Sequence, residues 1–201
     1  MRLPPGLVHL RSWLAQAFAA PLRWCAPLSL RLGRFKNEVR ARSLLVGPVA
    51  PGVQFIGSVQ VEGEGRVVIG AGTRIGRNAF FETYGPATIH IGQSVTINDG
   101  VVMVAYSGIV IGDHAMIGEY TSIRDANHGT SQGQPVRLQP HVSSPIYVGE
   151  DAWLGRGVFV GKGVCIGAGA VIGANSVVTK NIEPQTIAAG VPARQIGMRE
   201  P

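Results

Sequence analysis

A six-residue period runs through residues 148–179 and constrains the fold more than any other feature of the chain. The repeated aliphatic positions are Val148, Leu154, Val160, Ile166, Ile172 and Val178, and Gly follows each of the first five. A small or short side chain stands four places after each of those five, at Ala152, Val158, Val164, Ala170 and Ser176. An internal repeat this regular indicates a solenoid, in which each repeat packs on its neighbours.

A period of six favours short strands over a helix. Glycine at every sixth position would cost a helix about 1 kcal/mol each time. In a strand, the aliphatic residue and the small residue four places later point to the same side and can share one interior. We expect the Gly after each aliphatic to occupy a bend with positive φ. Three strands per coil then predict a triangular prism with coils ~4.8 Å apart, whereas a flat antiparallel sheet would need Asn-Gly-type hairpin turns that are missing from this stretch.

The period is interrupted at three places. It begins near residue 53 and has short breaks at 84–90 and 106–108. The next repeat is due at residue 129 but starts at 148, so a loop of 19 residues, 129–147, is inserted. Loops on a rigid scaffold often carry function, so we expect the breaks to form the site. The sequence thus predicts an extension at 1–50, a prism at 51–183 and a tail at 184–201 that folds back.

The basic charge of the chain belongs to its N-terminal extension. Residues 1–42 contain eight basic residues and one acidic residue, against ten basic and eleven acidic residues in the remainder. Apolar residues of this extension share one helical face: Leu7, Leu10, Leu14, Ala17 and Phe18. Arginines keep its apolar runs below the ~20 residues of a membrane span. Two interpretations fit: a helix that packs on the solenoid and covers its edge, and a basic amphipathic segment that rests on an anionic membrane.

Other composition features favour a cytoplasmic protein, with association with the inner face of the membrane through residues 1–42 as an additional expectation. Cys25 and Cys165 form no disulfide or zinc pattern, and the N-terminus lacks the cleavage site of a signal peptide. The repeat body carries no excess of basic residues, so a nucleic-acid partner is not expected.

His128 is the first candidate for chemistry, because it stands where the long insertion leaves the repeat. A histidine on a rigid scaffold suits general-base work near neutral pH. His141, inside the insertion, can approach the same place. Nucleophilic catalysis is disfavoured, since Cys165 has no histidine spaced to serve it and no Gly-x-Ser-x-Gly elbow occurs.

Three stretches resemble the hexapeptide-repeat O-acetyltransferases: residues 125–128 (DANH), the repeat at 143–182, and residues 188–197 (AAGVPARQIG). The resemblance covers about residues 89–197 and is nearest to galactoside, maltose and polysaccharide-pathway acetyltransferases. It implies an all-β fold, the left-handed parallel β-helix, assembled as a homotrimer. It also implies active sites between neighbouring prisms, acetyl-CoA as cosubstrate in the groove between them, and no metal.

The resemblance also implies roles for single residues. His128 would be the general base that takes the proton of an acceptor hydroxyl, and Asp125 would either orient the imidazole or cap the loop. Asn98 would line the acceptor pocket, or would simply occupy a corner. Tyr106 stands where galactoside enzymes carry an acidic residue, which argues against a galactoside acceptor; with His141, it would complete the pocket.

The remaining implied residues concern the cofactor. Trp153 would lie beside the extended arm of the cofactor, or would only cover the flank of the prism. Arg156 departs from the small residue of the family, but its backbone N–H could still donate to the developing oxyanion. The other implied contacts are Ala174, Thr179 and Arg194, with Lys180 near a phosphate.

The leading hypothesis is therefore an acetyl-CoA-dependent O-acetyltransferase that acts on a sugar hydroxyl in surface-polysaccharide or exopolysaccharide synthesis. One alternative is N-acetylation of an amino sugar or of a xenobiotic. Another is a β-helix without catalytic activity that serves as a scaffold.

Overall fold

The computed structural model describes residues 28–200, so the predicted apolar face of residues 7–18 lies outside the described part of the chain. The chain divides into two compact units, residues 1–36 and 37–201. A helix occupies residues 28–44 of the described chain and therefore belongs partly to each unit.

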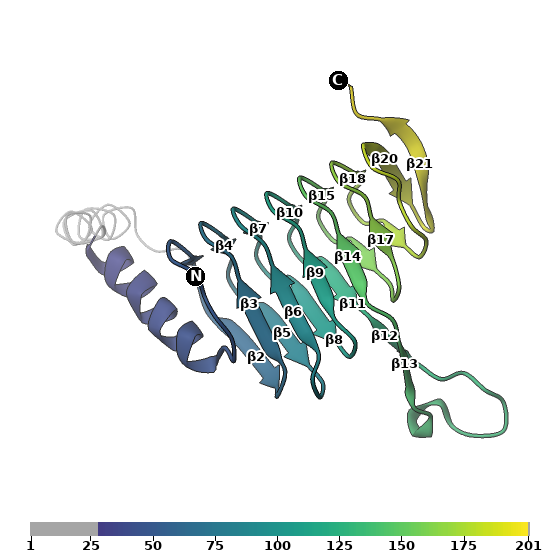
Figure 1. Cartoon of the computed structure of the whole chain (residues 1–201), viewed down its shortest axis with the longest axis horizontal. Helices are drawn as coiled ribbons and strands as arrows, with labels where there is room; N and C mark the ends of the chain where they lie inside the picture. Colours follow the sequence, from purple (N-terminus) through teal and green to yellow (C-terminus); the bar gives the residue numbers. More distant parts are fainter. Residues whose placement is uncertain (1–27, 201) are drawn as a thin grey trace, which may run out of the picture. The chain divides into compact units, whose positions relative to one another are not determined.

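The second unit is a solenoid of about seven coils whose strands form three parallel faces (Figure 1). Face A consists of β3 (Arg66–Ile69), β6 (Thr88–Ile91), β9 (Ile109–Ile111), β14 (Ile146–Val148) and β17 (Cys165–Ile166). Face B consists of β1 (Gln54–Phe55), β4 (Arg74–Ile75), β7 (Thr96–Ile97), β10 (Met116–Ile117), β15 (Trp153–Leu154), β18 (Val171–Ile172), β20 (Thr186–Gly190) and β21 (Ala193–Met198). Face C consists of β2 (Val59–Gly63), β5 (Ala79–Thr83), β8 (Val102–Ala105), β11 (Ser122–Arg124), β16 (Phe159–Val160) and β19 (Val177–Val178).

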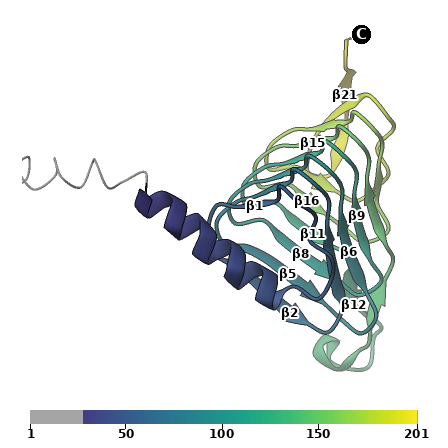
Figure 2. The same ribbon diagram turned by 60° about the vertical axis from the view of Figure 1, so that its left-hand side comes forward.

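The coils stack in register and outline a triangular prism (Figure 2). Each coil runs from face B to face C to face A, and each strand of the three faces before β21 pairs in parallel with the strand one coil away. On face C, for example, Ile123 pairs with Met103 on one side and with Val160 on the other. The predicted left-handed parallel β-helix is confirmed.

The two side-chain positions of the repeat line one interior, as predicted. Leu154, Val160 and Ile172 are buried, and so are the small residues Ala152 and Ala170 between them. Because the interior of the prism is narrow and closely packed, half of the inward positions of each coil take short side chains. Even the polar Ser176 fits, because its hydroxyl accepts a hydrogen bond from the backbone N–H of Gly190 at 3.0 Å.

The expected reason for the repeated glycines is wrong. Gly149 and its equivalents do not have positive φ; residues two places later, such as Gly157 and Asn175, adopt that conformation instead. What Gly149 allows is close stacking, since a Cβ there would lie 2.5 Å from the backbone nitrogen of Ala168 in the next coil. Gly112 meets the same limit, 2.5 Å from the nitrogen of Glu150. The repeat therefore requires glycine for room between coils rather than for a left-handed turn.

Both ends of the prism are covered. At the N-terminal end, Ala41 and Leu45 join the hydrophobic core, and Asn37 donates a hydrogen bond to the carbonyl of Ile56 at 3.4 Å. Residues 37–45 thus pack on the first coils, whereas the face at residues 7–18 to which the first interpretation applied lies outside the described residues. At the other end, β20 still pairs in parallel with β18, so the prism ends one strand later than predicted. Only β21 folds back, antiparallel to β20.

Candidate active site

The breaks in the repeat all lie along one edge of the prism, between faces C and A, which we call the C–A edge. Residues 84–86 and 106–108 connect β5 to β6 and β8 to β9 there. The long insertion leaves the same edge between β11 and β14. Because the coils are stacked, these segments are brought side by side although they are 17 to 36 residues apart in the sequence.

The insertion forms an arm made of β12 (Ala126–His128), the 3-10 helix η1 (Val136–Leu138) and β13 (His141–Ser143), which projects from the prism (Figure 1). β12 and β13 pair antiparallel, with His128 directly opposite His141. The arm therefore occupies 126–143 rather than the predicted 129–147, and Ile146 is already part of face A, in register with Ile109.

Four aromatic rings lie in a row between the C–A edge and the arm; the first three are stacked and the fourth is tilted. Tyr84 stacks on Tyr106 with ring centroids 3.9 Å apart, and Tyr106 stacks on His141 at 4.5 Å. His141 in turn lies 4.2 Å from the ring of His128. The Tyr106 hydroxyl is also 3.4 Å from Nε2 of His141. The ring stack, Tyr84–Tyr106–His141–His128, thus joins two breaks of the repeat to the candidate base.

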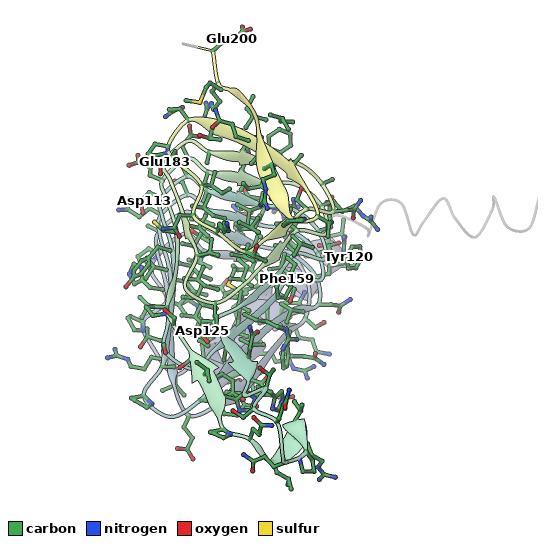
Figure 3. All side chains as sticks on the ribbon, turned by 90° about the vertical axis from the view of Figure 1, so that its right-hand side faces the viewer. Asp113, Tyr120, Asp125, Phe159, Glu183 and Glu200 are labelled. Carbon is green, nitrogen blue, oxygen red and sulfur yellow. The ribbon has the colours of Figure 1, made fainter. Side chains whose placement is uncertain are left out.

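Asp125 holds this arrangement at the point where the arm leaves the prism (Figure 3). Its side chain is fully buried. Oδ1 accepts the backbone N–H of Tyr106 at 2.7 Å, and Oδ2 accepts those of Ser107 at 2.7 Å and Gly108 at 2.6 Å. These three charge-assisted bonds go to the neighbouring coil rather than to the imidazole of His128. Of the two predicted roles, the geometry favours capping, although the capped turn is that of residues 106–108 and not the insertion itself.

A cleft of about 400 Å³ opens in front of the ring stack. It is lined by Glu82, Tyr84, Val104, Tyr106, Arg124, Ala126, Asn127, His128 and His141. The pKa of the Tyr84 phenol is raised above its usual range, mainly by a hydrogen bond to Glu82 and to a smaller extent by one with Tyr106. This hydroxyl therefore stays protonated. The cleft therefore combines flat rings, a carboxylate, a guanidinium and an accessible imidazole.

A second cleft of about 270 Å³ lies beside the first, and Asn127 borders both. Its other lining residues are Phe159, Gly161, Lys162 and Thr179. A third cleft of about 290 Å³ lies further along, lined in part by Lys180 and Arg194. The predicted residues Thr179, Lys180 and Arg194 thus border clefts that contain cationic side chains. Phe159 and Lys162 were missed from the sequence, because both occupy ordinary outward positions of the repeat.

The other predicted residues do not join this site within one chain. Asn98, Arg156 and Ala174 follow strands β7, β15 and β18 and lie along the edge between faces B and C, which we call the B–C edge. Trp153 lies on face B beside that edge and is half exposed. Face C separates the B–C edge from the C–A edge. Arg156 is held by the ring of Tyr120, 5.4 Å from its guanidinium carbon.

Comparisons with known proteins agree with the repeat. The family described as "Bacterial transferase hexapeptide (six repeats)" matches residues 145–180. No curated protein matches the sequence of the chain. The hexapeptide-repeat acetyltransferase VCA0836 of Vibrio cholerae, solved with acetyl coenzyme A, is 28% identical, with a TM-score of 0.52 over 79% of this chain and 74% of that one.

A variant of AntD, an N-acyltransferase from Bacillus cereus solved with dTDP and coenzyme A, has a TM-score of 0.70 at 22% identity. The match covers 84% of this chain and 91% of AntD. At this identity the likeness shows the fold. The predicted resemblance to hexapeptide-repeat acetyltransferases is confirmed.

Proposed function

We propose that this protein is an acetyl-CoA-dependent O-acetyltransferase that acts on a sugar hydroxyl, with His128 as the general base. The observation that carries the proposal is the position of His128. Its accessible imidazole lines the larger cleft, and the neighbouring residue Asn127 borders the second, cation-lined cleft. A base in this position lies where an acceptor in one cleft would meet a donor that reaches in from the other.

The larger cleft suits a sugar. Sugar rings bind to flat aromatic surfaces and to pairs of polar groups, and here the exposed Tyr84 supplies a ring while Glu82 and Arg124 supply the polar groups. VCA0836 is a hexapeptide-repeat acetyltransferase solved with acetyl coenzyme A, which supports the same choice of donor. Lys162, Lys180 and Arg194 fit the phosphates of such a donor as cationic partners.

The chemistry needs little from the protein. Acetyl-CoA, when bound, supplies an acetyl group that is already activated as a thioester. His128 takes the proton from the acceptor hydroxyl as its oxygen attacks, and the imidazolium then returns that proton to the departing thiolate. The backbone N–H of Arg156 from a neighbouring chain would donate to the oxygen on which negative charge develops. No covalent enzyme intermediate is required.

The proposal includes a homotrimer. Asn98, Trp153 and Arg156 lie along or beside the B–C edge, and His128 lies at the C–A edge of the same chain. A complete site therefore forms if the C–A edge of one chain faces the B–C edge of the next. Such head-to-tail contacts close into a ring when the rotation between neighbours is one third of a turn.

The test is release of the free thiol from acetyl-CoA with a panel of sugars. Replacement of His128 by Ala should lower kcat by roughly 10²–10⁴-fold. His90→Ala is the matched control, since His90 is an exposed histidine of face A outside the clefts. Equal activity of the His128 variant and the wild type would refute the mechanism.

The same panel decides between O- and N-acetylation. Each hydroxyl sugar is paired with the amino sugar that differs at one position. Glu82 is the residue that could hold an ammonium group, which is the feature of the cleft that favours the alternative acceptor. Faster turnover of the amino sugars would favour the N-acetyltransferase. A Tm that does not change when CoA is added would favour the scaffold.

A further inference from the structure

The helix segment 28–36 carries an apolar stripe that faces solvent. Leu28, Leu32 and Phe35 are spaced four and three residues apart, so they lie on one side of the helix. Their side chains are 62%, 60% and 66% exposed. A helix of a soluble protein normally buries such a stripe, so this one invites a partner outside the described chain.

The charge around the stripe is uniformly positive. Segment 28–36 contains Arg31, Arg34 and Lys36 and no acidic residue. At 100° per residue, Arg31 and Lys36 lie on the two sides of the stripe. A stripe flanked by cations is typical of a helix that lies in the interface of an anionic bilayer, with apolar side chains among the lipid tails and cations at the headgroups.

We infer that segment 28–36 docks this protein on an anionic lipid surface. A second copy of the same helix fits less well, because pairing two apolar stripes would bring their flanking cations together without any acid of the segment to compensate. The cations are also spread along the helix instead of gathered at one point, which suits a field of headgroups. Docking in this manner is peripheral, since no helix among the described residues is long and apolar enough to cross a membrane.

Leu30 offers a matched control. It belongs to the same segment and is 63% exposed, but it lies on the opposite side of the helix from the apolar stripe. Leu30→Glu and Leu32→Glu therefore change charge, apolar surface and helix propensity equally, and differ only in the side of the helix that they alter.

The experiment measures sedimentation of the intact chain with vesicles of phosphatidylcholine containing phosphatidylglycerol, and with vesicles of phosphatidylcholine alone. Wild type should bind the anionic vesicles more strongly, and high salt should weaken this binding. Leu32→Glu should reduce binding by about tenfold relative to Leu30→Glu, because it alone removes a side chain that enters the apolar layer.

Three results would overturn the inference. The first is equal binding of wild type to both vesicle types. The second is an equal effect of the two substitutions, which would assign any binding to charge alone. The third is a lower Tm for Leu32→Glu with unchanged vesicle binding, which would mean that the stripe is covered by another part of the chain or by a second protein. None of these results bears on the acetyltransferase activity, which is measured without vesicles.

Discussion

Asp125 is the residue that ties the repeat to the candidate site. Its buried carboxylate accepts three backbone N–H groups from residues 106–108. In Asp125→Asn, an amide NH₂ replaces one of the accepting oxygens, so at least one buried donor loses its partner at a cost of about 1–3 kcal/mol. We expect a lower Tm, and lower activity because Tyr106 is no longer held.

Asp113→Asn is the control for this prediction, because Asp113 accepts a single backbone N–H, from Gln93 at 2.8 Å, on another edge of the prism. Its Tm should fall by less. An unchanged Tm of Asp125→Asn, together with a shifted pH profile of activity, would instead mean that Asp125 acts on the titration of His128.

His141 tests whether the ring stack positions the base. His141→Phe keeps a flat ring between Tyr106 and His128, whereas His141→Ala removes it. If the ring positions His128, the Ala variant should lose about tenfold or more in kcat, because small displacements of a catalytic group are costly, and the Phe variant should lose less. Steady-state kinetics of both variants decide this, and equal losses would show that the imidazole nitrogen matters rather than the ring.

The sequence predicted the place of the site better than its internal contacts. His128, Tyr106 and His141 were expected near one another because each lies in a break or in the insertion, and the structure brings their rings together. The partners of Asp125 could not be predicted, since its hydrogen bonds reach back 17 to 19 residues. That separation depends on how the coils stack, which the spacing of residues does not reveal. Phe159 and Lys162 were missed because they occupy ordinary outward positions of the repeat.

Among the elements, the glycine that follows the aliphatic residue of a repeat makes a sharp prediction. Gly149→Ala would place a Cβ 2.5 Å from the nitrogen of Ala168, while a Cβ at Gly161 would be 3.5 Å from the nearest atom, the carbonyl oxygen of Val178. Both glycines follow an aliphatic residue of the repeat and neither has positive φ. We expect Gly149→Ala to cost about 1–3 kcal/mol, which is several degrees of Tm for a chain of this size.

Gly161→Ala should change the Tm by less than a degree or two on the same scale. Thermal unfolding followed by circular dichroism measures both variants. Equal losses would mean that backbone conformation, and not room between coils, selects glycine at this position of the repeat.

The periodicity predicted the strands and their inward side chains, but not where the chain leaves the prism. Residues 123–128 keep the period, yet the backbone departs after Arg124, because β12 pairs with β13 instead of continuing to face A. The sequence also predicted the C-terminal end of the prism too early in the chain. β20 has no repeat glycine at the expected position, but its backbone still bonds to β18. At the insertion the side-chain pattern thus outlasts the strand pairing of the prism, whereas at the C-terminal end the pairing outlasts the pattern.

At the scale of the whole molecule, the positions of Asn98 and His128 on different edges make the homotrimer testable by mixing. Each of the variants Asn98→Ala and His128→Ala should have little activity by itself. If each site takes His128 from one chain and Asn98 from the next, a trimer with both kinds of chain contains some sites in which neither residue is altered. Random assembly of equal amounts gives about a quarter of such sites, because two independent choices of chain must both be right.

The measurement is acetyl transfer by trimers purified after co-expression of the two variants, compared with a mixture of the separately purified variants that cannot exchange chains. The co-expressed sample should recover about a quarter of wild-type kcat and the mixture should recover none. Wild type co-expressed with a double variant, which carries both substitutions in one chain, provides the reference activity for trimers in which only some of the sites are intact. Absence of recovery in the co-expressed sample would mean that Asn98 and His128 act in the site of the same chain. Full activity of Asn98→Ala by itself would remove Asn98 from the site. In either case the shared-edge trimer would have to be abandoned.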